Sequence, residues 1–268
     1  MLRRFGSFIV LACVSACGTA QRDVAPVSTV QPVQPDLVSI AEIDPTIVVE
    51  ARYYGIHNFI GRRIAGYEAP KCLLARPAAL ALKAAQADVR PYGLSIKAYD
   101  CYRPQRAVAD FAAWARDIDD TKMKAEFYPT IDKGRLFELG YIAERSGHSR
   151  GATVDLTLIP MDSADGPGYR LRNAGQEPFR EGQPLVSCTA PVEQRFRDNT
   201  LDMGTGYDCF HELSHTANPA VSETARRNRL LLKSVMEKHG FVNYAQEWWH
   251  FTFRPEPYPS TYFDVPVR

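Results

Sequence analysis

The pattern of apolar and polar residues along the chain predicts a fold that mixes helices and strands. Helical periodicity and end signals predict helices over residues 77–89, 104–118 and 222–239, and apolar or alternating runs predict strands over 94–99, 153–159 and 241–253. Strands and helices follow one another without regular alternation, which is typical of the α+β class. We therefore expect a single domain with one antiparallel sheet and flanking helices. Residues 161–200 are polar and contain glycines and prolines, which predicts a long loop.

The strand expected over residues 153–159 carries an acid among apolar residues. Its residues alternate in character, with Val154, Leu156 and Leu158 on one face and Thr153, Asp155 and Thr157 on the other. A carboxylate in such a strand is costly unless a cation or several donors satisfy it. Asp155 is therefore a candidate metal ligand.

Two histidines and a glutamate complete a candidate zinc site at the sheet. His148 lies shortly before Asp155, and the run Glu247-Trp248-Trp249-His250 follows much later in the chain. Two imidazoles and one carboxylate give zinc three protein ligands, and the fourth position of a catalytic zinc holds water. We expect His148, Asp155 and His250 to bind one zinc ion, and Glu247 to accept the proton of that water.

The second half of this site makes a demand on the backbone. Residues 241–253 are rich in aromatic and branched side chains, which predicts a strand, yet residues three apart on a regular strand point to opposite faces. Glu247 and His250 can share one site only if the chain turns or bulges between them.

A second short motif competes for the metal. Residues 211–215 read H-E-L-S-H, which matches the H-E-x-x-H signature of zincin metalloproteases. The segment follows Gly204 and Gly206 and stops at Asn218-Pro219, which leaves little room for the long helix that such a site needs. We expect a loop near the substrate or a short surface helix here, with a catalytic role as the alternative.

Composition and charge limit the class of partner. The chain has 268 residues, 45% of them hydrophobic, and a formal net charge of +1. This length supports one sizeable core, and a balanced charge without a basic tail gives no sign of a nucleic-acid partner.

The N-terminus has the pattern of an export signal. Arg3 and Arg4 precede a short apolar run over residues 8–14, which is too short to span a bilayer. Residues 14–17 resemble a bacterial lipobox, in which the cysteine, here Cys17, is acylated and becomes the new N-terminus. Ordinary signal cleavage near Ala16 or Ala20 is the alternative.

We expect three segments: a signal peptide over residues 1–17, a flexible tether over 18–40 and one folded domain over 41–268 that contains the candidate zinc site. The tether prediction depends on prolines among polar residues. We expect a protein of the periplasm or cell envelope that is attached to the membrane by the lipid on Cys17.

The cysteines agree with export. Without Cys13 and Cys17, four remain in the expected domain: Cys72, Cys101, Cys188 and Cys209. An even number in an oxidising compartment predicts two disulfides, and three pairings are possible. We favour Cys72 with Cys101 and Cys188 with Cys209, because each bond would then join residues within one half of the fold.

Four segments carry a resemblance to the VanX-type zinc D-alanyl-D-alanine dipeptidases. They are residues 146–158 (S-G-H-S-R-G-A-T-V-D-L-T-L), 247–250 (E-W-W-H), 99–108 (Y-D-C-Y-R-P-Q-R-A-V) and 258–267 (Y-P-S-T-Y-F-D-V-P-V). The segments occur in the family's order, so the resemblance extends from about residue 40 to the C-terminus. The chain departs from the family pattern at Ile56-His57, where we expect a small residue and then an acid or amide. It departs also at Cys101, where we expect alanine or glycine.

The resemblance implies a role for each candidate residue. It makes His148, Asp155 and His250 the zinc ligands and Glu247 the catalytic base, in agreement with the chemistry above. It implies that Arg103 steadies the substrate carbonyl in the transition state, and a guanidinium fork next to Pro104 at a helix start suits that task. It also places Ser146, Asp208 and Tyr53 in contact with a small substrate.

The expected function is hydrolysis of the D-Ala-D-Ala dipeptide to free D-alanine. A D,D-carboxypeptidase or endopeptidase acting on larger muropeptides is a close alternative, and a non-catalytic zinc-holding module that binds the cell wall is a more distant one. Glu247 favours an enzyme, because a binding module has no need for a base beside the metal.

Overall fold

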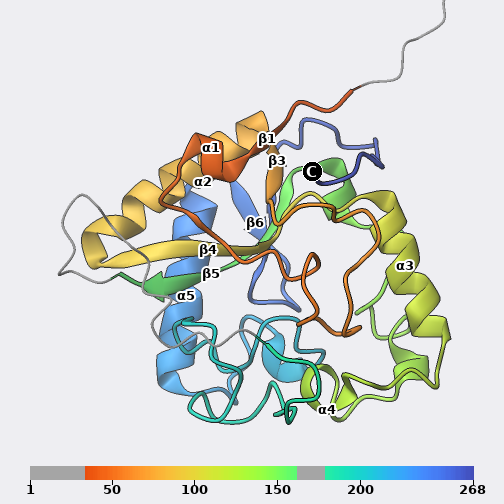
Figure 1. The fold of residues 1–268 in the computed structure, drawn as a ribbon. Helices are drawn as coiled ribbons and strands as arrows, with labels where there is room; N and C mark the ends of the chain where they lie inside the picture. The colour runs from red at the N-terminus through yellow and green to blue at the C-terminus, as the bar shows by residue number, and fades with distance from the viewer. Residues whose placement is uncertain (1–33, 162–178) are drawn as a thin grey trace, which may run out of the picture. The chain divides into compact units, whose positions relative to one another are not determined.

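The computed structural model describes residues 34–161 and 179–268, shown as the coloured ribbon in Figure 1. The predicted signal peptide, Cys17 and most of the predicted tether lie outside the described residues. The short strand β1 (Leu37–Ser39) starts within the last residues of that expected tether. None of the described helices is long and apolar enough to cross a membrane.

A five-stranded sheet forms the centre of the fold, in the order β2-β4-β5-β7-β6. Its strands are β2 (Val48–Val49), β4 (Leu94–Asp100), β5 (Thr153–Pro160), β7 (His250–Phe253) and β6 (Phe241–Asn243). Every neighbouring pair is antiparallel except β2 and β4. The antiparallel prediction is therefore wrong for β2, because the chain between β2 and β4 includes the helix α2 (Arg76–Val89), a crossover that returns it in the same direction.

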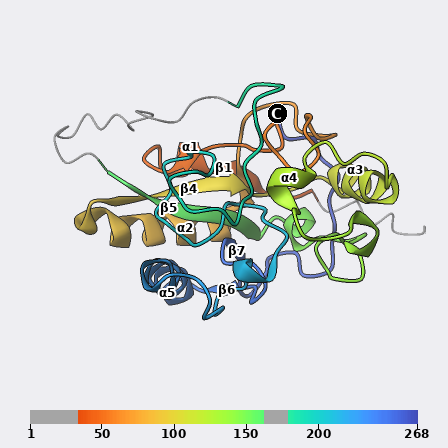
Figure 2. The ribbon, with the colours of Figure 1, turned by 90° about the horizontal axis from the view of Figure 1, so that it is seen from below.

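Helices flank this sheet, as the α+β prediction requires. The helices α2 and α5 (Glu223–Lys238) contact each other, and their apolar faces share a core with the strands β4, β5 and β7. Figure 2 shows both helices on one side of the sheet. Between α2 and α5 in the chain lie α3 (Gln105–Arg116) and the short helix α4 (Lys124–Phe127). The three predicted helices match α2, α3 and α5 to within two residues at each end.

The remaining elements are short. They are α1 (Ile40–Ile43), β3 (Leu73–Ala75), which pairs with β1, and the 3-10 turns η1 (Arg90–Tyr92), η2 (Lys133–Arg135), η3 (Gly147–Arg150) and η4 (Glu212–Ser214). A second, mainly aromatic core gathers around α3 and α4 and includes Tyr53, Phe59, Phe111 and Phe210.

The strand β5 is buried on both faces rather than on one. Val154, Leu156 and Leu158 join the core beneath the helices, but Thr153, Asp155 and Thr157 are buried as well. Loop residues cover part of this second face: the hydroxyl of Thr157 forms a hydrogen bond with that of Thr200. The described part of the predicted loop, residues 179–200, contains no helix or strand and supplies part of this cover. Asp155 consequently lies in a site shielded from water.

The segment predicted as one strand over residues 241–253 is a hairpin of two. The chain turns between β6 and β7, where Glu247 donates its N–H to the carbonyl of Tyr244 at 3.0 Å and His250 donates to that of Glu247 at 3.3 Å. Asn243 helps to close this turn, since its side-chain amide donates to the carbonyls of Glu247 and His250, both at 3.1 Å. This is the turn that a shared site for Glu247 and His250 requires.

Both favoured disulfides are present. Cys72 is bonded to Cys101, next to the ends of β3 and β4, and Cys188 is bonded to Cys209 in the loop region that covers β5.

Candidate active site

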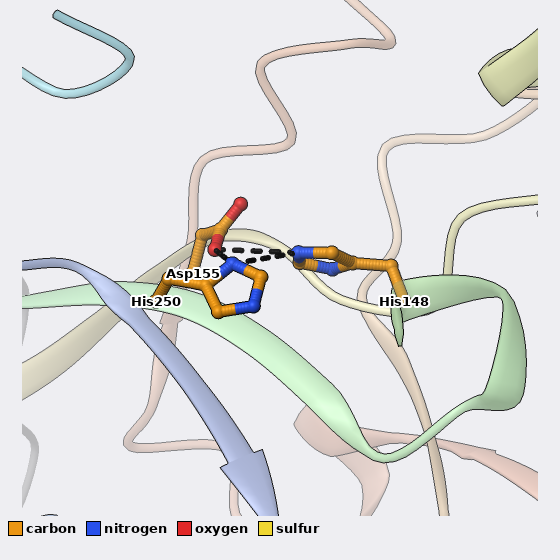
Figure 3. A group of neighbouring side chains, drawn as sticks. All are labelled: His148, Asp155 and His250. Carbon is orange, nitrogen blue, oxygen red and sulfur yellow. Dashed lines mark hydrogen bonds and ion pairs between the residues drawn. The ribbon is translucent and has the colours of Figure 1, made fainter. Parts of the chain in front are cut away.

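Three side chains from separate elements converge at one end of the sheet. His148 lies on η3, Asp155 on β5 and His250 at the start of β7, and the antiparallel register of β5 with β7 sets Asp155 directly opposite His250. Figure 3 shows the three groups pointing toward one another. The Nε2 of His148 lies 3.4 Å from Oδ1 of Asp155, and the Nδ1 of His250 lies 3.0 Å from the same oxygen. The two ring nitrogens are 3.3 Å apart.

This triangle has the dimensions of a metal site. Tetrahedral zinc with ligand distances of about 2.0–2.1 Å places its ligand atoms roughly 3.3 Å apart. Oδ1 of Asp155 is buried and receives no hydrogen bond of proper geometry, so it is an acceptor that lacks a donor. Burial alone would raise the pKa of Asp155, but the imidazoles of His148 and His250 outweigh burial and hold that pKa well below its usual range. Among the described residues, these three form the group of His, Cys, Asp or Glu side chains close enough to hold a metal ion.

A backbone carbonyl fixes the orientation of His148. Its Nδ1–H donates to the carbonyl of Cys101 at 2.7 Å, which leaves the lone pair of Nε2 facing Asp155. Burial lowers the pKa of His148 and so favours the neutral ring that a metal needs. Ser146 begins the turn, since its hydroxyl accepts the backbone N–H of His148 at 3.3 Å. The turn ends at Gly151, whose φ of 77° is left-handed.

Glu247 lies beside the triangle, on the turn between β6 and β7. One of its carboxylate oxygens is 3.4 Å from Nδ1 of His250, and its side chain is 16% exposed, toward the cleft. Burial raises the pKa of Glu247 from 4.5 to about 7, with the nearby charge of Asp155 adding to this effect and His250 opposing it. Such a carboxyl group can both accept and release a proton near neutral pH.

Arg103 lies on the other side of Asp155 and is held from several directions. Its Nε donates to Oδ2 of Asp100 at 2.9 Å, and its Nη2 lies 3.7 Å from Oδ2 of Asp155. The guanidinium lies over the rings of Tyr53 and Phe111, at 5.2 Å and 4.9 Å from their centres. The helix α3 begins two residues later, so Arg103 precedes a helix N-terminus as expected.

Sequence reasoning missed two residues that support this arrangement. Asp100 is buried at the end of β4, where it accepts hydrogen bonds from Arg103 and from the hydroxyl of Tyr67 at 2.5 Å. Tyr207 donates its hydroxyl to Oδ2 of Asp155 at 3.1 Å. The signal for Asp100 was available, since it is an acid that ends a buried strand, as unusual there as Asp155 is in β5.

A cleft of about 230 Å³ opens above the triangle. Its walls include all eight residues that the sequence singled out for the site: Tyr53, Arg103, Ser146, His148, Asp155, Asp208, Glu247 and His250. Asp208 has a left-handed backbone, with φ of 56°, and its Oδ2 accepts the hydroxyl proton of Tyr53 at 2.8 Å. Burial raises the pKa of Asp208 well above its ordinary value, and the charge of Asp155 raises it further.

The competing H-E-x-x-H motif forms a different structure. Residues 212–214 are the single 3-10 turn η4, and Nδ1 of His211 accepts the N–H of Leu213 at 3.0 Å, as a cap does. His211 and His215 therefore do not lie one turn apart on an α-helix, and neither belongs to the metal-capable group of the described residues. The motif is the short turn that its flanking glycines and proline predicted.

Comparison with known proteins agrees with this geometry. The family model described as D-Ala-D-Ala dipeptidase, peptidase M15, matches residues 34–165 and 180–268. A D-alanyl-D-alanine dipeptidase of Streptomyces coelicolor is 34% identical over 87% of this chain and 98% of its own length. Proteins of the same name are 34% identical in Enterococcus faecalis, over 81% of this chain and 91% of theirs, and 32% identical in Escherichia coli, over 81% and 83%. The chain therefore belongs to the D-Ala-D-Ala dipeptidase family of M15 peptidases, and it is a hydrolase.

Proposed function

We propose that this protein is a zinc-dependent dipeptidase that hydrolyses D-Ala-D-Ala to free D-alanine. The observation that carries the proposal is the triangle of His148, Asp155 and His250 with Glu247 at its edge, because it combines a metal-sized ligand set with a carboxyl group of nearly neutral pKa. The relatives named as D-alanyl-D-alanine dipeptidases support the choice of substrate.

Zinc held by these three ligands would lower the pKa of water in its fourth position toward roughly 7 and polarise the scissile carbonyl. In the proposed reaction Glu247 would accept a proton from the attacking water and then deliver it to the nitrogen of the leaving amine. The nearly neutral pKa of Glu247 suits both directions of transfer. Both imidazoles would bind the metal as neutral rings, and His148 is oriented for this by its bond to the carbonyl of Cys101.

Arg103 is proposed to bind the carbonyl oxygen as negative charge develops on it. Asp100 and the two aromatic rings hold the guanidinium in place before substrate arrives, so little reorganisation is needed in the transition state. Arginine keeps its charge in this half-buried position, where a lysine would lose it more readily.

Asp208 and Tyr53 are proposed to bind the ammonium group of the substrate, and Ser146 to contact the substrate nearby. Asp208 lies in a dry site where an arriving ammonium would stabilise its ionised form, so binding of the substrate and ionisation of Asp208 favour each other. The cleft volume of about 230 Å³ is below the usual range of roughly 300–1,000 Å³ for drug-sized ligands, which suits a dipeptide.

Larger muropeptides are the second candidate substrate, since a D,D-carboxypeptidase or endopeptidase would use the same ligands and base. The small cleft favours the dipeptide over these. Binding without turnover is disfavoured, because the half-buried carboxyl group of Glu247 has a raised pKa beside the metal ligands, which favours a role in proton transfer.

Export with lipid attachment at Cys17 remains part of the proposal. The two disulfides support an oxidising compartment, since such bonds are rare in the cytosol. The mass of the mature N-terminal peptide from membranes tests it: a diacylated or triacylated Cys17 supports the anchor, and an unmodified peptide that begins after Ala16 or Ala20 contradicts it.

The deciding experiment measures release of D-alanine from D-Ala-D-Ala by the purified protein. Activity should disappear with a chelator, return with zinc and be lost in Glu247→Ala, and it should persist in His211→Ala, the matched control in the competing motif. If the folded, zinc-loaded protein releases no D-alanine, the dipeptidase proposal is wrong. Release of D-alanine from pentapeptide muropeptides alone would move the assignment to a carboxypeptidase.

A further inference from the structure

The disulfide between Cys72 and Cys101 lies next to the candidate metal ligands, and its surroundings suggest a role beyond general stability. We propose that this disulfide is a positioning device, which holds the carbonyl of Cys101 against His148 and the side chain of Arg103 in the cleft. The part that concerns Arg103 rests on the proposed dipeptidase function. The part that concerns His148 requires only that the triangle binds a metal ion.

Reciprocal hydrogen bonds join the segment after β4 to the turn that carries His148. The carbonyl of Cys101 accepts Nδ1–H of His148 at 2.7 Å, and the backbone N–H of Arg103 donates to the carbonyl of His148 at 3.4 Å. The position of Cys101 therefore sets the ring orientation of the ligand His148. The same short segment, residues 101–103, also carries Arg103. A shift of this segment would move both groups together.

The sheet does not hold this segment by itself. The pairing of β4 with β5 shifts register between Ala98 and Asp100, and β4 ends at Asp100. Beyond that point Cys101 has no partner in the β4–β5 ladder. Cys101 is fully inside the protein, at 2% exposure, so its side chain can be tied only to a neighbouring buried element.

Strand β3 is the buried element to which Cys101 is tied. It forms hydrogen bonds both to the segment after β4 and to the turn that carries His148. Leu73 accepts the N–H of Tyr102 at 2.8 Å, and Ala75 donates its N–H at 2.7 Å to the carbonyl of Gly151, which ends the turn of His148. Cys72 directly precedes β3, so its bond to Cys101 joins the start of this strand to the end of β4. The disulfide closes a ring of contacts around the ligand.

Reduction would convert the bond into two thiols with uptake of two electrons and two protons from an added dithiol, which becomes a disulfide. The carbonyl of Cys101 would remain as an acceptor but would no longer be tethered. Loss of such support around a metal ligand typically lowers metal affinity by about 10-fold to 100-fold, and the lower end applies here because the acceptor persists.

The test compares two paired variants of the otherwise intact protein. Cys72→Ser with Cys101→Ala removes the proposed device. Cys188→Ser with Cys209→Ala removes the other disulfide and is the control, because the backbone N–H of Cys188 donates to the carbonyl of Glu126 and not to a metal ligand. Zinc affinity is measured by competition with a chromophoric chelator. In the metal-free proteins, NMR hydrogen exchange follows the amides of Tyr102 and Arg103.

We expect about a tenfold loss of zinc affinity and faster exchange of both amides in the first variant only, with kcat for D-Ala-D-Ala reduced and KM nearly unchanged. Equal zinc affinity and equal exchange in both variants, with similar losses of thermal stability, would show that the bond is merely structural and overturn the proposal. If the first variant loses zinc affinity but even the unmodified protein releases no D-alanine, the proposed function fails while the positioning of His148 stands.

Discussion

Replacing Glu247 with glutamine should make the metal-free protein more stable at alkaline pH and should remove most of the activity of the zinc-loaded protein. The substitution keeps the size of the side chain and removes its ability to ionise. A rise of the pKa from 4.5 to about 7 means that the folded, metal-free protein prefers the protonated carboxyl group by about 3 kcal/mol relative to the unfolded chain. This preference is fully present below pH 4.5 and is lost as the pH rises through about 7.

Metal-free Glu247→Gln should therefore match the unmodified protein in stability at pH 4.5 and exceed it at pH 8 by up to about 3 kcal/mol. Urea unfolding of both proteins in the presence of a chelator, at the two pH values, measures this difference. The same variant, loaded with zinc, should lose about 10²-fold to 10⁴-fold in kcat because it lacks a general base. Zinc affinity should change little, since the three ligands are intact.

Two results would refute this reasoning. A variant that is less stable than the unmodified protein at pH 8 would show that the carboxylate of Glu247 is not strained by burial. A variant that keeps more than about a tenth of the activity would exclude Glu247 as the base, given the usual contribution of such a group. His211→Ala, which changes a cap on a surface turn, provides the control for both measurements.

Four further outcomes are expected. Asp155→Ala should abolish zinc binding as measured by equilibrium dialysis, because it removes the proposed ligand that lies beside both imidazoles. Asp100→Asn should lower kcat for D-Ala-D-Ala by about tenfold with KM little changed, since it loosens Arg103 without touching the substrate; an unchanged kcat would contradict this. Asp208→Asn should raise KM for D-Ala-D-Ala by about tenfold, as expected for loss of a charged partner of the ammonium group worth about 1.4 kcal/mol. The acidic limb of kcat/KM should lie at or below about pH 7, because bound zinc can only lower the pKa of Glu247 from its metal-free value; a limb well above pH 7 would contradict the assignment of the base.

Local patterns predicted the elements that are stabilised by their own apolar faces. The helices α2 and α5 and the strands β4 and β5 show clear periodicity, and each lies where that periodicity placed it. The hairpin of β6 and β7 could not be predicted in this way, because its turn contains two fully buried tryptophans, Trp248 and Trp249, and so has the composition of a strand. The side chain of Asn243, which bonds to two carbonyls of the turn, replaces the glycine or proline that would have revealed it.

The electrostatic balance of the site depends on contacts that no local pattern contains. Asp100, Asp155, Asp208 and Glu247 are far apart in the sequence, yet the fold gathers them around one half-buried arginine, Arg103. Burial is the main cause of the raised pKa of both Asp208 and Glu247, and the charge of Asp155 raises both further, because the site holds more acid than its one cation can balance. A divalent cation at the triangle would reverse this condition, since it would neutralise Asp155 and favour ionisation of the other two. The metal that the ligand triangle fits is thus also the charge that would turn Glu247 into a base and Asp208 into a partner for an ammonium group.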